Sequence, residues 1–373
     1  NPYPVKFAGE VSDFDASEYI DRKEVKRTDR YSQFAIAASV QAMREAGLEK
    51  DSASIDPDMF GVIIGSGIGG ISTFEEQHGR FIEKGPDRVS PFFVPMFIAD
   101  IAAGLVSIRY GAKGPNYATV SACASGAHAI GSAFRSIQVG EADVMLTGGT
   151  EACVTPMTLS GFAALTALSE RNDSPDTASR PFDLTRDGFV LAEGAGMVVL
   201  EELEHAKARG ANIIAEISGF GQTGDAYHIT APAMGGEGAV RAMRAAVRSS
   251  GAQFEEVGYV NAHGTSTPAN DLNETAAIKT TFGEHAYKMI VSSTKSMTGH
   301  TLGAAGAIEA VITALIVKNG MIPPTTNYST PDPDCDLDYA TSGAVQREVN
   351  LALSNSFGFG GHNVSLAVKR WAE

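Results

Sequence analysis

The same order of predicted elements occurs twice along the chain, and few folds can accommodate such a repeat. In the first part, strand-like "FGVIIG" leads to a Gly-rich turn, and "YATVSAC" leads to helical "SGAHAIGSAFRSIQVG" and strand-like "DVMLTGG". In the second, "VGYVNAHG" precedes helical "DLNETAAIKTTFG", and "KMIVSSTKSMTGH" precedes helical "LGAAGAIEAVITALIVKNG". Alternating strands and helices predict an α/β fold. We expect two related halves, residues 1–210 and 211–373, which divide where a charged helix ends near Gly210.

Composition and charge exclude several classes of function. The 373 residues are 43% apolar, which is typical of a soluble globular protein, and the net charge of −15 argues against nucleic-acid binding. Glu309 interrupts the longest apolar run, so we expect no membrane span. The chain shows neither a secretory nor a transit segment, which favours a cytoplasmic location. It begins without Met, and we expect a leading segment before Asn1.

The cysteine count directs attention to one thiol. The chain has three cysteines and no CxxC pair, which disfavours a disulfide framework or a cysteine-based metal site. Cys123 stands in "TVSACASGAHAIGSAF", where an extended run gives way to small residues and then to a helical pattern. The start of a helix stabilises a thiolate, so we expect a lowered pKa for Cys123. Cys123 is therefore a candidate nucleophile, although a small buried residue would also fit this alanine-rich run.

Two histidines and a lysine in the second half favour the catalytic interpretation. "NAHGTSTP" places His263 directly after a predicted strand, and "SSTKSMTGH" places Lys295 and His300 directly before a helix rich in small residues. In open α/β sheets, ligands bind outside the carboxyl ends of the strands. Two imidazoles there can donate hydrogen bonds to one carbonyl oxygen and stabilise an enolate.

The segment "ALSNSFGFGGHN" near the C-terminus allows two interpretations. Glycines surround Phe357 and Phe359, so the turn could offer a backbone N–H to a substrate and move an aromatic side chain as a gate. It could equally be a tight turn with two phenylalanines of the core. Spacing alone does not distinguish between these.

Together the motifs resemble the β-ketoacyl-acyl carrier protein synthases of thiolase fold, and most closely the elongating type, synthase II. The similarity covers nearly the whole chain. It rests on "GSGIGG", "SPFFVP", "SACASGAH", "ADVMLTGGTEA", "ASRPFD", "RDGFVLAEGAG", "GDAYHIT", "YVNAHGTSTP", "SSTKSMTGHTLGAAGAIEA", "PPTTN" and "NSFGFGG". The resemblance implies a thiolase fold whose duplicated halves form a five-layered α-β-α-β-α sandwich.

The resemblance also implies a reaction, the condensation of malonyl-acyl carrier protein with an enzyme-bound acyl thioester in fatty acid elongation. Cys123 would hold the acyl chain, while His263 and His300 would bind the malonyl thioester carbonyl as CO2 leaves. The amides of Cys123 and Phe359 would form the oxyanion hole. A pair of catalytic histidines is typical of the elongating synthases, and an intact Cys123 argues against an inactive chain-length factor.

Further residues acquire roles from the same resemblance. Lys295 would pair with Glu309 and support the histidines. Thr265 and Thr267 would hydrogen-bond the phosphopantetheine arm, which arrives on the carrier protein, so no cofactor or metal is expected. The acyl and pantetheine pockets would also include Ile68, Phe162 and Phe357, with Phe359 as the gate.

The resemblance implies acyl carrier protein and a second copy of the chain as partners. Basic residues expected to dock the carrier protein are Lys23, Lys26, Arg27 and Arg88. Asp87 and Thr166 depart from the family pattern, because they fall where basic residues are frequent. His362 replaces a common threonine, a change that we expect to be neutral. The family's first strand and helix would precede Asn1.

Four alternatives remain at this point. "GSGIGG" fits the fingerprint of a dinucleotide-binding oxidoreductase, with Asp87 at a suitable distance, but "KGPDRVSPFF" around Asp87 predicts a loop and not a strand end. A degradative thiolase would need a second cysteine as base near the C-terminus, where the chain has "NSFGFGGHN". A polyketide ketosynthase would share the Cys-His-His set. A non-enzymatic binding module would have no use for that set.

Overall fold

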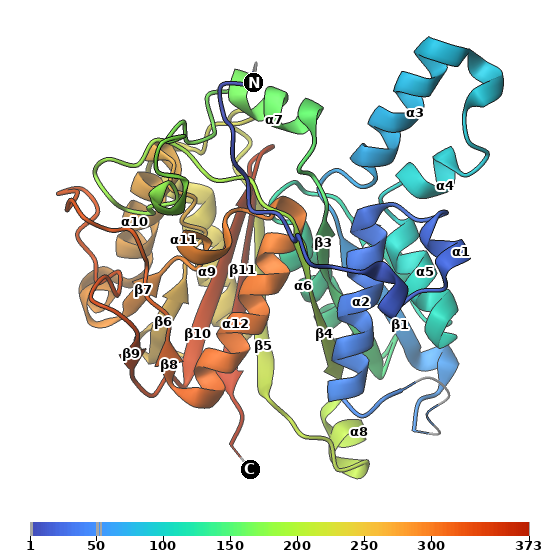
Figure 1. The fold of residues 1–373 in the computed structure, drawn as a ribbon. Helices are drawn as coiled ribbons and strands as arrows, with labels where there is room; N and C mark the ends of the chain where they lie inside the picture. The colour runs from blue at the N-terminus through green and yellow to red at the C-terminus, as the bar shows by residue number, and fades with distance from the viewer. Residues whose placement is uncertain (1–2, 50–51, 53, 373) are drawn as a thin grey trace.

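The computed structural model describes residues 3–49, 52 and 54–372, which contain two sheets that face each other across a central pair of helices (Figure 1). The first sheet has the order β2-β1-β3-β4. Its strands are β1 (Phe60–Gly65), β2 (Asn116–Thr119), β3 (Val144–Glu151) and β4 (Gly194–Glu201). The strands β2, β1 and β3 are parallel, and β4 is antiparallel to β3.

The second sheet has the order β5-β11-β10-β6-β7. Its strands are β5 (Ala215–Gly224), β6 (Val257–Asn261), β7 (Ile290–Ser292), β10 (Leu351–Gly358) and β11 (His362–Arg370). The strands β10, β6 and β7 are parallel, and β11 is antiparallel to both β10 and β5. A separate short pair consists of β8 (Met321–Ile322) and β9 (Val345–Gln346).

The repeat predicted from the sequence is visible in the sheet topology. Strands β2, β1, β3 and β4 correspond to β7, β6, β10 and β11, with the same neighbours and the same directions. The second sheet continues with β5, whereas no strand in the described ranges pairs with the outer edge of β4. The predicted boundary near Gly210 falls between β4 and β5. The expectation of a further strand before Asn1 stays a prediction.

Helices form the other three layers. The central layer contains α6 (Ser125–Gln138) and α12 (Ala305–Asn319), whose small residues pack with side chains of the second sheet. The helices α2 (Arg30–Glu45) and α5 (Ile101–Tyr110) cover the outer face of the first sheet. The helices α9 (Glu237–Ser249) and α10 (Pro268–Phe282) cover the outer face of the second. The predicted five-layered α-β-α-β-α sandwich is thus confirmed.

Glycine allows the central helices to approach the strands and each other. A Cβ at Gly126 on α6 would lie 2.8 Å from the carbonyl oxygen of Gly303 and 3.0 Å from Cβ of Ala307 on α12. A Cβ at Gly149 on β3 would lie 2.6 Å from the same oxygen. Since real Cβ atoms do not come so close, this contact between the halves requires glycine at both positions.

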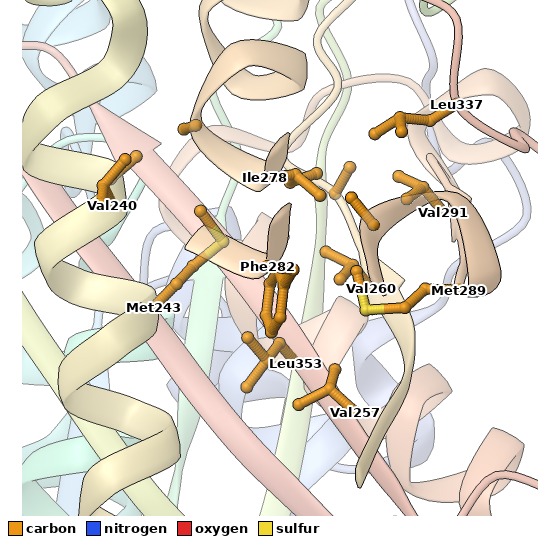
Figure 2. Close-up of a cluster of buried hydrophobic side chains, with 14 of the residues drawn as sticks. Val240, Met243, Val257, Val260, Ile278, Phe282, Met289, Val291, Leu337 and Leu353 are labelled. Carbon is orange, nitrogen blue, oxygen red and sulfur yellow. The ribbon is translucent and has the colours of Figure 1, made fainter. Parts of the chain in front are cut away.

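The outer layer of the second half shows how apolar periodicity becomes a core. Figure 2 shows side chains of α9, α10 and the sheet pointing toward one another: Val240, Met243, Val257, Val260, Ile278, Phe282 and Leu353. Burying one side chain of this size contributes roughly 1.5–3 kcal/mol. This packing holds α10 in place, and α10 carries groups that support the site described below.

The remaining helices connect the layers. They are α1 (Arg22–Val25), α3 (Ile71–Lys84), α4 (Phe93–Phe97), α7 (Pro156–Ala164), α8 (Leu203–Ala208) and α11 (Lys295–Thr298). Helix α3 projects away from the body at the upper right of Figure 1. The stretch Leu302–Asn319 is long and apolar enough to cross a membrane, but it is mostly buried because α12 is a central core helix.

Candidate active site

Cys123 lies in a tight turn between β2 and α6. Ala122 has a φ of 51°, a left-handed conformation that is uncommon outside glycine. Ser125 stabilises the turn, because its Oγ accepts a hydrogen bond from the Ser121 amide at 2.9 Å and donates one to the Ala122 carbonyl at 2.6 Å. Such a strained turn between strand and helix presents the side chain of Cys123 at the edge of the sheet.

The thiol of Cys123 is buried, with 9% of the residue exposed. Burial raises its pKa to about 12, although the nearby Lys295 opposes this change. The sequence-based expectation of a lowered pKa is therefore wrong, because desolvation outweighs the helix start. The resting nucleophile is a neutral thiol, and it must lose its proton in the reaction that uses it.

His263 and His300 approach Cys123 from the second half. His263 directly follows β6 and Ala262, and His300 directly follows α11 and Gly299. One ligand atom of each histidine and the sulfur of Cys123 all lie within 4.8 Å of one another. Burial lowers the pKa of both imidazoles well below the usual value, and the charge of Lys295 acts in the same direction. Both rings are thus neutral, and each can donate one hydrogen bond.

Lys295 connects the histidines to a buried carboxylate. Its ammonium forms an ion pair with Glu309, and the two side chains are only 1% and 3% exposed. Its Nζ also lies 3.3 Å from Nδ1 of His263. Burial raises the pKa of Glu309 to about 7, and Lys295 opposes this increase. The predicted pairing of Lys295 with Glu309 is present in the structure.

A cavity of about 350 Å³ leads to these groups. Its lining includes most of the residues that the resemblance assigned to substrate binding: Cys123, His263, His300, Thr265, Thr267, Phe162, Phe357 and Phe359. Thr265 and Thr267 share a hydrogen bond of 2.9 Å between their hydroxyl groups. Ile68 does not line the cavity, and packs instead in an apolar cluster that contains Cys123.

The C-terminal glycine segment reaches the nucleophile. A Cβ at Gly358 would lie 3.1 Å from the amide nitrogen of Cys123 and 2.6 Å from the carbonyl oxygen of Ser121. Phe359 follows directly, and its ring lies 6.3 Å from the ring of Phe162. The segment "SFGFGG" is therefore part of the cavity wall beside Cys123, which favours the first of its two interpretations.

The predicted docking residues lie outside this cavity. Lys23, Lys26, Arg27 and Arg88 are exposed, the first three on or just after α1 and the last in a 3-10 turn before α4. The guanidinium of Arg27 lies 4.8 Å from the ring centroid of Phe92, which brings these two segments together. Their role in docking stays a prediction.

Sequence reasoning missed Glu274, a buried carboxylate on α10. Its oxygens accept hydrogen bonds from the amides of His263 and Gly264 at 2.9 and 2.8 Å and from Nδ2 of Asn355 at 3.2 Å. Burial raises its pKa to about 7. The position was detectable in the sequence, because Asp271, Glu274 and Ile278 recur at steps of three and four residues. They therefore lie on one face of the predicted helix, and that face is buried.

A second missed carboxylate explains the "GSGIGG" segment. Glu151, at the end of β3, accepts hydrogen bonds from the amides of Gly67 and Ile68 at 2.7 and 3.2 Å. These amides are the donors that a dinucleotide phosphate would need. Asp87 lies in an exposed turn and not at a strand end. The geometry therefore argues against the dinucleotide-binding alternative.

The side chains around the cavity include groups that could bind a metal ion. Cys123, His263 and His300 are the one set of acidic, histidine or cysteine side chains in the described residues with the spacing of a metal site. Each of the three has a use without a metal, as a nucleophile or a hydrogen-bond donor. The expectation that the site needs no metal and no cofactor stays a prediction.

Comparison with protein families follows the same division into halves. The β-ketoacyl synthase N-terminal domain matches residues 3–206, and the C-terminal domain matches residues 214–329. The chain belongs to the β-ketoacyl synthase family. The family assignment and the relatives below support an enzyme that condenses acyl units, which argues against a non-enzymatic binding module.

Individual relatives are similar over nearly the whole chain. A 3-oxoacyl-(acyl-carrier-protein) synthase 2 of Synechocystis sp. is 56% identical over 366 residues, which are 98% of this chain and 88% of the relative. The enzyme of the same name from Staphylococcus aureus is 56% identical over 370 residues, 99% of this chain and 89% of the relative.

Solved structures of family members have the same fold. A β-ketoacyl synthase from Burkholderia phymatum has a TM-score of 0.93 and 38% identity, and the alignment covers 100% of this chain and 90% of that one. A type II polyketide ketosynthase, in complex with its acyl carrier protein, has a TM-score of 0.92 and 37% identity, with 99% and 89% coverage.

Proposed function

We propose that the protein is an acyltransferase that elongates fatty acyl chains, through the decarboxylating condensation of malonyl-acyl carrier protein with an acyl group held on Cys123. The products would be 3-oxoacyl-acyl carrier protein, CO2 and free carrier protein. The observation that carries this proposal is the convergence of one thiol and two neutral imidazoles within 4.8 Å at the end of a cavity.

In the first step, the sulfur of Cys123 attacks the thioester of an acyl carrier protein. The new C–S bond forms as the old one breaks, and the thiol proton of Cys123 ends on the carrier thiol, which leaves. The amides of Cys123 and Phe359 stabilise the oxyanion of the tetrahedral intermediate. One such donor typically contributes about 100- to 1000-fold in rate.

In the second step, the malonyl thioester loses CO2, and the electron pair of the broken bond forms an enolate. Since the ammonium of Lys295 donates to Nδ1 of His263, the proton of that ring resides on Nε2, from which it donates to the thioester oxygen. His300 donates a second hydrogen bond. The carbanion attacks the acyl carbon, and the bond to the sulfur of Cys123 breaks. Cys123 leaves as a thiolate, which takes up one proton from solvent water, because its original proton left with the first carrier protein.

Residues that line the cavity and basic residues on the surface indicate how the carrier protein and its phosphopantetheine arm would bind. Thr265 and Thr267 line the cavity and offer hydroxyl groups to a phosphopantetheine arm, which the carrier protein would bring with it. The exposed basic residues of α1 and Arg88 suit an acidic carrier protein. The polyketide relative in complex with its acyl carrier protein supports a partner of this kind.

A second copy of the chain is the other proposed partner. The strand β2 lies at the edge of the first sheet, and Tyr117 and Val120 in and just after it are 43% and 61% exposed. An exposed edge strand with apolar side chains pairs readily with another strand. A homodimer would cover this edge.

We also propose that the protein is located in the cytoplasm, because its carrier proteins would be synthesised in that compartment.

A polyketide ketosynthase is the second candidate, because one structural neighbour is a ketosynthase of that type. The identity of 56% to the 3-oxoacyl-(acyl-carrier-protein) synthase 2 relatives, against 37% to the polyketide ketosynthase, favours fatty acid elongation. The test is a competition between malonyl carrier proteins from the two pathways, with a saturated acyl carrier protein as acceptor and the products weighed by mass spectrometry. A single extension and release by the fatty acid carrier supports the proposal, whereas repeated extension without reduction on the polyketide carrier overturns it.

A further inference from the structure

The loop after β1 encloses a single carboxylate, that of Glu151, which is 0% exposed. One carboxylate oxygen accepts from the hydroxyl of Ser66 at 3.0 Å and from the amide of Ile68 at 3.2 Å. The other oxygen accepts from the amide of Gly67 at 2.7 Å and from the amide of Gly303 at 2.9 Å. All four partners donate, and three of them are backbone groups, so the arrangement matches a carboxylate.

The backbone on both sides is shaped around this carboxylate. A Cβ at Gly67 would lie 2.8 Å from an oxygen of Glu151, and one at Gly303 would lie 2.6 Å from the same oxygen. Only glycine permits these contacts. Hydrogen bonds to a charged acceptor are also stronger than those between neutral groups. Glu151 thus fixes the relative positions of a loop of the first half and a turn of the second.

The two segments that Glu151 holds both border the nucleophile. Ile68 and Leu302 belong to the apolar cluster that contains Cys123 and Phe162. Leu302 directly precedes Gly303 and also lines the cavity. Ile68 packs against this cluster but does not line the cavity. An acyl chain on the sulfur that extends beyond the cavity would meet this cluster, and it would have to displace a partly buried member such as Ile68.

We propose that Glu151 is a positioning residue that determines acyl-chain specificity. Its hydrogen bonds to the amides of Ile68 and Gly303 restrain both segments, and they therefore determine how readily Ile68 moves aside for a long acyl chain. The inference rests on the proposed condensation. Glu151 itself touches no reacting atom, and its effect passes through Ile68.

The test uses Glu151→Gln, which replaces one carboxylate oxygen with an amide group that cannot accept from a backbone N–H. The kcat/KM values of the purified protein are measured with butyryl and dodecanoyl carrier protein at fixed malonyl carrier protein. We expect the dodecanoyl-to-butyryl ratio to rise about tenfold, since the loss of one hydrogen bond to a charged group typically has an effect of this size. The ratio cancels any change that affects both substrates equally.

Glu201→Gln is the matched control. Glu201 is also a shielded carboxylate, but it pairs with Arg209 at the opposite end of the β3–β4 ladder. We expect its ratio to equal that of the wild type. An equal rise in Glu201→Gln, or an unchanged ratio in folded Glu151→Gln, would overturn the inference.

A double-mutant cycle tests whether the effect passes through Ile68. In an Ile68→Ala background, Glu151→Gln should no longer change the ratio, and a persistent rise would contradict the proposed route. If Glu151→Gln does not fold, Ser66→Ala, which removes one of the four donors, should raise the ratio in the same direction by less, and no rise would count against Glu151. A wild-type protein that elongates neither substrate would instead refute the condensation itself.

Discussion

The ammonium of Lys295 lies 3.3 Å from Nδ1 of His263, and this contact determines which ring nitrogen of the histidine carries the proton. An ammonium group can only donate, so Nδ1 accepts and the ring proton resides on Nε2. Lys295 therefore acts through His263 and also compensates the buried charge of Glu309.

Lys295→Met should separate these two contributions. Without the ammonium, His263 is free to take the wrong tautomer, and we expect malonyl decarboxylation to fall about 100-fold, the typical loss for one misplaced donor. Removal of one partner from a buried ion pair also destabilises the fold by about 3–5 kcal/mol. Decarboxylation is followed as CO2 release, and stability by urea unfolding.

The double variant Lys295→Met with Glu309→Gln provides the control. The buried charge is then absent, so most of the stability should return while decarboxylation stays low. Recovery of decarboxylation in the double variant would show that Lys295 serves only to neutralise Glu309.

Cys123→Ala should abolish condensation and leave malonyl decarboxylation measurable. The two histidines that bind the malonyl carbonyl remain, whereas no residue can hold the acyl chain. Product mass and CO2 release are measured in parallel. If condensation persisted in this variant, Cys123 could not be the residue that holds the acyl chain.

His263→Ala and His300→Ala should each suppress decarboxylation itself. Each variant loses one of the two hydrogen bonds to the enolate oxygen, and we expect a fall of about 100- to 1000-fold in the rate of CO2 release. Acyl transfer to Cys123, measured by mass in the absence of malonyl carrier protein, serves as the control. A variant that releases CO2 at the normal rate would remove that histidine from the carbonyl-binding role.

The pH dependence of alkylation tests the burial of Cys123. Burial raises the pKa of its thiol to about 12, so the reactive thiolate is a small fraction that grows tenfold with each pH unit. The rate of inactivation by iodoacetamide should rise steadily from about pH 7 to about pH 10, with no plateau. Saturation near neutral pH would indicate a lowered pKa and contradict the structure.

Gly126→Ala tests the contact between the two halves. The added methyl would meet the carbonyl oxygen of Gly303 at 2.8 Å, and such overpacking typically costs about 1–3 kcal/mol of unfolding free energy. Gly79→Ala is the control, because this glycine of α3 has open space around it. We expect a gain of about 0.5–1 kcal/mol there from helix propensity. Equal effects of the two changes on the urea midpoint would argue against the close contact.

Much of the fold and of the site was predictable because strand ends, helix periodicity and polar loops are local features. The strands that precede Cys123 and His263 were recognisable from the sequence, and the repeat indicated where the two halves would meet. The pKa of Cys123 was predicted wrongly, since burial depends on chain segments far away in sequence.

The carboxylate of Glu151 shows what local patterns cannot reveal. It accepts hydrogen bonds from the backbone amides of Gly67, Ile68 and Gly303, which lie far from it in the sequence. A backbone donor leaves no trace in the sequence except a glycine such as Gly67 or Gly303. The "GSGIGG" segment could therefore suggest a phosphate site, although the anion it binds is a side chain of the same chain.

The central claim is that Cys123 carries the acyl chain between two carrier proteins. The most direct measurement is peptide mass spectrometry of the protein after incubation with acyl carrier protein thioester alone, and again after addition of malonyl carrier protein. The account predicts an acyl mass on the peptide that contains Cys123, which disappears as 3-oxoacyl carrier protein forms. Product formation with no acyl group on Cys123 at any time would contradict it.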